Sequence, residues 1–96
     1  MDVENNSIPH VDPFRLMLQS VASDVTNEDL IAMKFLCESH IPKGRLEKLI
    51  RPLELFSVLI EQDLIGDKQS KFLTDIFDEI GRHDLSKRIL DKEGEK

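Results

Sequence analysis

Apolar residues recur along most of the chain at intervals of three and four, the spacing that places them on one face of an α-helix. No stretch alternates apolar and polar residues for long enough to indicate a β-strand, and the sequence shows no internal repeat. The pattern therefore predicts an all-α fold with one core. Six short helices are expected. The first begins at Asp12-Pro13, with apolar spacing up to Val25, and the second runs from Thr26 to about Glu38 or Ser39. The third covers 45–50, the fourth begins at Pro52, the fifth lies between Gly66 and Gly81, and the sixth covers roughly 83–90.

Two of these helix starts carry residues that suit a helix N-terminus. Asp12 can accept a hydrogen bond from the first backbone N–H groups, and Pro13 fits the first helical position, where no N–H is needed. Thr26 can cap the second helix in the same way. Glu28 and Asp29 come directly after it, where their negative charges suit the positive end of the helix dipole.

Length and charge narrow the function. A chain of 96 residues supports one modest core, so an enzyme with a large cleft between domains is not expected. We expect a folded domain at 12–91, with a flexible leader at 1–11 and a charged tail at 92–96 that begins a linker. The net charge of −6 argues against a protein that binds nucleic acid, because binding to the phosphates depends on a basic face. The longest dense apolar stretch, 53–60, is far shorter than the ~20 residues of a membrane span.

Candidate catalytic chemistry is sparse. Cys37 is the one cysteine, so no intrachain disulfide can form, and a reducing, intracellular location is expected. His40 lies three residues further on and could act as a base, but Cys37 sits in an apolar run that is typical of a buried structural thiol. The histidines are scattered and the glycines form no phosphate-binding loop, so neither a metal nor another cofactor is expected. The sequence predicts a protein that is not an enzyme.

The second predicted helix is apolar on two sides. Leu30, Met33 and Cys37 share one face at about 100° per residue, whereas Ile31 and Phe35, four residues apart, lie away from it. One interpretation is that Phe35 packs under a neighbouring helix. The other is an exposed apolar patch, which on a small soluble protein often marks a partner site.

Arg82 and Asp84 flank the start of the last predicted helix. Residues two apart do not face each other along one helix surface, so these side chains could share a third charged group from another helix. Asp29 is one candidate, since an arginine binds carboxylates through two parallel hydrogen bonds. The alternative, which spacing alone favours, is two unrelated surface charges, with Asp84 suiting the helix N-terminus.

Four segments of the chain carry a resemblance to a known family: Leu30-x-x-Met-Lys-Phe-Leu-Cys37, Leu55-Phe56, Phe72-Leu73 and Gly81-Arg-His-Asp-Leu85. Taken together, they resemble a death effector domain. The resemblance covers about Pro13 to Leu90 and implies a six-helix antiparallel bundle of the death-fold superfamily. Further matches near the first, fourth and last helices are most similar to the N-terminal domain of an adaptor in death-receptor signalling.

The resemblance also implies positions for an interaction site. Phe35, with Ile31 beside it, would be the centre of an apolar patch formed by the second and fifth helices, and this patch would dock onto the first and fourth helices of another domain. Gln19 would lie on the receiving face, where relatives often have His or Tyr. Asp29, Arg82 and Asp84 would form a charge triad. Further charged contacts are implied for Lys43, Lys48, Glu54 and Glu61.

The function implied by the resemblance is recruitment without catalysis. Such a module binds the death effector domains of initiator procaspases and of their inactive homologues, associates with itself, and acts in the cytoplasm to trigger apoptosis. Contact with a death receptor would require a separate C-terminal death domain, and neither nucleic acid nor membrane insertion is expected. The alternatives are a death effector domain from another regulator or from a procaspase prodomain, and a passive docking bundle from an enzyme.

Overall fold

The computed structural model describes residues 11–94, so most of the expected leader, 1–10, and the last two residues lie outside the described part. Within residues 11–94 the chain is helical and has no β-strand, only an isolated bridge between Gly66 and Gln69. The all-α prediction is confirmed. The helices are α2 (Pro13–Ala22), α3 (Asn27–Cys37), α4 (Lys43–Glu47), α5 (Pro52–Glu61), α6 (Lys71–Glu79) and α7 (His83–Glu93).

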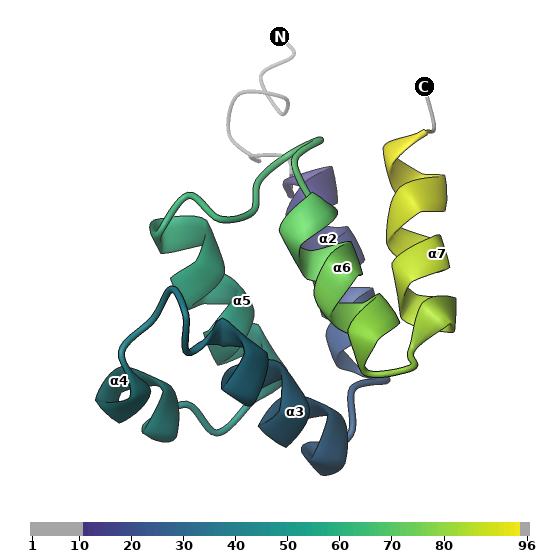
Figure 1. Cartoon of the computed structure of the whole chain (residues 1–96). Helices are drawn as coiled ribbons and strands as arrows, with labels where there is room; N and C mark the ends of the chain where they lie inside the picture. Colours follow the sequence, from purple (N-terminus) through teal and green to yellow (C-terminus); the bar gives the residue numbers. More distant parts are fainter. Residues whose placement is uncertain (1–10, 95–96) are drawn as a thin grey trace, which may run out of the picture.

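Buried side chains from the helices form one apolar core. Figure 1 shows how the helices are arranged. α6 and α7 run antiparallel and side by side, joined by a tight turn at Gly81. Gly81 has a φ of 82°, a backbone conformation that residues with a Cβ rarely adopt, which explains why this position ends the helix pattern. The largest fully buried side chains come from all six helices and from the connection after α3, and they include Leu18, Met33, Leu46, Phe56, Phe77 and Leu85.

In the N-terminal half of the chain, the bounds of two helices, α2 and α4, differ from those predicted. α2 ends at Ala22 rather than near Val25, because the chain must become extended at Thr26 to cap α3. α4 spans Lys43–Glu47 rather than 45–50. It ends early because the backbone N–H of Ile50 donates to the Glu54 side chain and so belongs to the start of α5.

The last helix is longer than expected. α7 continues to Glu93, past both the expected helix end near Leu90 and the expected domain limit at 91. The hydroxyl of Ser70 donates to Oε2 of Glu93 over 2.6 Å, which ties this end of α7 to the start of α6. The first residues of the expected charged tail are therefore helical.

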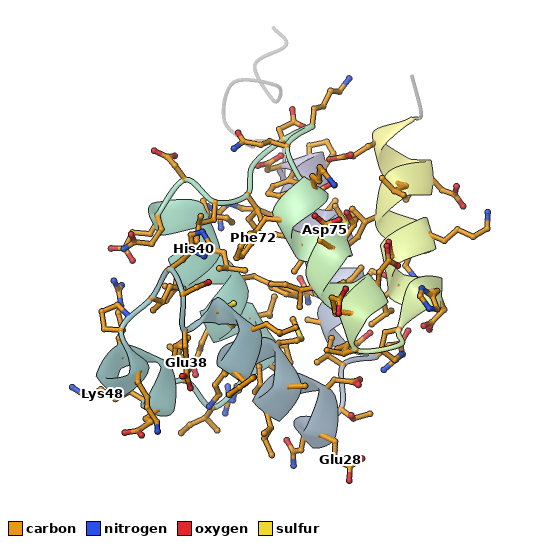
Figure 2. The ribbon with its side chains drawn as sticks, in the orientation of Figure 1. Glu28, Glu38, His40, Lys48, Phe72 and Asp75 are labelled. Carbon is orange, nitrogen blue, oxygen red and sulfur yellow. The ribbon has the colours of Figure 1, made fainter. Side chains whose placement is uncertain are left out.

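Cys37 and His40 do not form a catalytic pair. The Cys37 side chain is fully buried, and burial raises the pKa of its thiol to about 11, so the thiol stays protonated at neutral pH. The His40 ring instead packs edge-on against Phe72, with ring centroids 5.0 Å apart (Figure 2). The structural role expected for Cys37 is the one that its surroundings support.

Candidate protein-interaction site

The capping of α3 fixes which of its side chains face outward. Thr26 Oγ1 accepts a hydrogen bond from the backbone N–H of Asp29, and Asp29 Oδ2 accepts one from the N–H of Thr26, both at 3.0 Å. This start aims Leu30, Met33 and Cys37 at the core. On the other side of the helix, Ile31 is 67% exposed and Phe35 is 68% exposed, so Phe35 does not pack under a neighbouring helix.

A hollow of about 240 Å³ lies beside Phe35, between α3 and α4. Its floor includes the buried Leu46, and Glu38 stands between the two helices at its edge (Figure 2). An apolar base with a charged rim suits the insertion of a partner's apolar side chain. The residues that line the hollow are Ile31, Lys34, Phe35, Glu38, Lys43, Leu46 and Glu47.

The expected contribution of the fifth helix, α6, to this patch is not seen. None of the large apolar side chains exposed within residues 11–94 belongs to α6. Its apolar residues Leu73, Ile76 and Phe77 face the core, and Phe72 is covered in part by His40. The hollow beside Phe35 is completed by α4 instead.

Arg82 binds both Asp29 and Asp84, the carboxylates whose pairing the spacing left open. Its guanidinium forms an ion pair with Asp29 from α3 and donates two hydrogen bonds of 3.1 Å to Asp84. It also donates to the backbone carbonyl of Asp24 over 3.1 Å, so one side chain links α3, α7 and the connection before α3. The bond to Asp84 raises the pKa of Arg82, and the same bond lowers the pKa of Asp84.

Two members of this charged cluster were not found from the sequence. Arg88 Nη2 lies 2.8 Å from Oδ2 of Asp24, and Arg88 Nη1 donates to the carbonyl of Ser20 over 3.2 Å. These bonds attach α7 to the end of α2. Arg88 lies in the middle of α7, and Asp24 lies in a turn with no motif, so nothing in the spacing linked them.

The other residues predicted to contact a partner are all exposed, but they differ in whether they already bind within the chain. Gln19 is exposed on α2, Lys43 lines the hollow, and Lys48 is exposed at the end of α4. Glu54 and Glu61 are also exposed, but both already bind within the chain. Glu54 Oε1 accepts from the N–H of Ile50 at 2.6 Å and of Arg51 at 3.1 Å, while Glu61 forms an ion pair with Arg45.

The bonds to Glu54 affect its ionisation. Hydrogen bonds from the backbone of Ile50 and then Arg51 lower the pKa of Glu54, because they stabilise its charged form. Glu54, in the first turn of α5, therefore caps the start of this helix.

Within residues 11–94, no group of three or more His, Cys, Asp or Glu side chains is arranged to hold a metal ion. The same part of the chain contains no helix that is long and apolar enough to span a membrane.

Comparison with known proteins bears on this site. The model of the family described as death effector domain matches residues 14–95. Human FAS-associated death domain protein is 36% identical over 83 residues, which cover 86% of this chain and 40% of the relative. Rat caspase-8 is 36% identical over 77 residues, 80% of this chain and 16% of the relative. The viral CASP8 and FADD-like apoptosis regulator of equine herpesvirus 2 is 31% identical over 86 residues, 85% of this chain and 48% of the relative. The chain thus spans less than half the length of these relatives.

Proposed function

Because the chain belongs to the death effector domain family, we propose that it is a non-enzymatic adaptor module that binds other death effector domains and recruits initiator procaspases in apoptotic signalling. The observation that carries the proposal is the outward position of Phe35 and Ile31 beside the hollow between α3 and α4. Full burial of a phenylalanine by a partner contributes about 1.5–3 kcal/mol relative to leaving it in water.

Two different faces of the domain take part in the proposed contact. Phe35 lies on α3, whereas the receiving face carries Gln19 on α2. A contact between unlike faces joins copies head to tail and leaves a free face at each end, so further domains can add. The Arg82 cluster supports this by fixing α3 against α7, which sets the orientation of Phe35.

Recruitment would act through concentration. Procaspases held on neighbouring modules would meet at an effective concentration in the millimolar range, so a weak mutual affinity becomes sufficient. The chain itself would perform no chemistry and would act in the cytoplasm. Contact with a death receptor would pass through a death domain elsewhere in the protein, and partners would include the inactive homologues of procaspases.

The test is binding of the variant Phe35→Asp to the immobilised tandem death effector domains of caspase-8. We expect affinity to fall on the order of 100-fold, because a central aromatic contact is replaced by a charge. Leu90→Asp is the matched control, since Leu90 is also an exposed apolar residue but lies on α7. Far-ultraviolet circular dichroism should be the same for all three chains. Unchanged binding by Phe35→Asp would refute the proposal.

A second candidate is a procaspase prodomain, favoured by the 36% identity to rat caspase-8. The two candidates differ in the domain that the gene encodes next. Sequencing of the transcript beyond Lys96 distinguishes them, because a prodomain continues into a second death effector domain and an adaptor into a death domain. A passive docking bundle, in contrast, would bind neither caspase-8 nor itself.

A further inference from the structure

A basic segment interrupts an acidic protein. Residues 43–51 contain four basic side chains and one acidic side chain, a net charge of +3. The whole chain carries −6, so the other residues together carry −9. Charge of one sign in the segment and the opposite sign elsewhere favours contact between copies at low salt. The basic side chains are Lys43, Arg45, Lys48 and Arg51, and the acidic one is Glu47.

Ile50 stands out within this basic segment. It is 75% exposed, more than any other large apolar side chain that the structure describes. Its backbone is nevertheless held in place: its N–H donates to Glu54 over 2.6 Å, and the carbonyl of Leu49 accepts from Nζ of Lys34 over 2.5 Å. A side chain fixed in an outward position loses little backbone freedom when a partner covers it, which favours binding.

The outer face of α6 has the complementary charge. Asp75, Asp78 and Glu79 are exposed at the i, i+3, i+4 spacing that places them together. Asp78 and Glu79 lie in the last turn of α6, at the negative end of the helix dipole, and no basic residue lies there. Lys71 lies in the first turn, at the positive end. Both arrangements place like charges together and are unfavourable.

Internal partners offset this acidic face only in part. Asp75 pairs with Lys71 at 3.1 Å and Asp78 with His83 at 3.0 Å. Glu79 makes no ion pair within residues 11–94. A charge arrangement that costs stability in the monomer is expected where a partner compensates for it.

We propose that Ile50, flanked by Lys48 and Arg51, docks onto the acidic outer face of α6 in a second copy of this chain. Lys48 projects outward from the end of α4, whereas Asp75 lies on α6 in another part of the molecule, so each copy presents both faces at once (Figure 2). The contact joins unlike faces and extends to further copies. It rests on the proposed self-association and adds a second contact, distinct from the Phe35 patch.

The experiment is sedimentation velocity of the 96-residue chain at about 0.1 M salt, where exposed charges still act over roughly 10 Å. We expect Ile50→Gln and Glu79→Lys each to weaken self-association about fivefold or more, with unchanged circular dichroism. An equimolar mixture of the two variants should form heterodimers with wild-type affinity. The mixture pairs the intact Ile50 of one variant with the intact α6 of the other. Leu90→Gln, which removes an exposed apolar residue on α7, should associate like the wild type.

Several outcomes would overturn the proposal. These are no self-association of the wild type, unchanged association of either variant, or a mixture that does not recover. Binding of the wild-type chain to anionic vesicles that is lost in Ile50→Gln, without any change in self-association, would also overturn it in favour of a membrane surface. Failure of the proposed function is separate, because it is measured by Phe35→Asp against caspase-8. If Ile50→Gln still associates normally while Phe35→Asp fails to bind, only the present proposal falls.

Discussion

Two phenylalanines show how differently α3 and α6 use their apolar residues. Phe77 on α6 is 0% exposed, whereas Phe35 on α3 is 68% exposed. α6 directs its large apolar side chains into the core and presents charges to water, while α3 carries apolar residues on two faces and buries only one. The core is complete without Phe35. Its position therefore has no explanation in the stability of the monomer, which supports the proposed contact with a partner.

The charged residues divide in a similar way. Arg82 is bonded to Asp29, Asp84 and a backbone carbonyl, so its charge is used inside the monomer to hold helices together. Lys48, in contrast, projects into solvent (Figure 2). A residue whose bonds are satisfied internally contributes to the shape of the site, and a residue without such bonds is available to a second molecule.

The largest effect that tests this contrast is on stability. We expect Phe77→Ala to lower the free energy of unfolding by about 3–5 kcal/mol, because it removes a fully buried ring and leaves a cavity. Phe35→Ala should change it by no more than about 0.5 kcal/mol. Urea denaturation at neutral pH measures both values. Similar losses in the two variants would mean that Phe35 packs within the monomer in solution and that the contrast is wrong.

A smaller effect is expected at the charged cluster. Arg82→Ala should destabilise the fold by about 1–3 kcal/mol, because the Asp29 side chain is only 13% exposed and would lose its counter-charge. Arg88→Ala is the matched comparison, since its partner Asp24 is half exposed, and it should cost no more than about 1 kcal/mol. Equal losses, measured by urea denaturation, would show that the burial of Asp29 has no energetic consequence.

The sequence predicted the fold better than it predicted the surroundings of the site. Helix starts at Asp12 and Thr26 depend on short-range hydrogen bonds, which the sequence displays directly, and the structure contains both. The outward face of α3 was also visible as a second apolar stripe. What periodicity could not give was the neighbour of that stripe, because packing between helices depends on distant residues. The hollow beside Phe35 is completed by α4, whereas the resemblance implied an apolar patch shared with the fifth helix, α6.

Long-range polar bonds could not be derived from spacing for the same reason. The spacing of Arg82 and Asp84 favoured two unrelated surface charges, and it left Asp29 as one candidate partner. The charge triad was implied only by the resemblance, and the folded chain brings Asp29, 53 residues away in sequence, to Arg82. Ile50 was missed because the sequence predicted a helix over 45–50 that would include it, whereas α4 ends at Glu47 and Ile50 lies between α4 and Arg51-Pro52. Its exposure depends on bonds made by Lys34 and Glu54, which come from two different helices.

The smallest predicted effect concerns Glu54, where a capping role and a contact with a partner were both possible. Hydrogen bonds from Ile50 and Arg51 lower the pKa of Glu54 in the folded state below the ordinary value of 4.5. The unfolded chain therefore takes up a proton first as the pH falls. The stabilisation is present above pH 4.5 and is lost as the pH falls through the folded-state pKa.

Glu54→Ala should accordingly be less stable than the wild type at pH 7, and the difference should shrink as the pH is lowered from 5 towards 3 (about the range set by an ordinary glutamate). Glu54→Gln is the control, because it keeps a side-chain acceptor but has no proton to gain, so its own contribution should not change over this range. Urea midpoints at pH 7, 5, 4 and 3 measure the trend. A constant difference between Glu54→Ala and the wild type would mean that this carboxylate does not cap α5 in solution and is available to a partner, which would also remove one of the bonds that hold Ile50 outward.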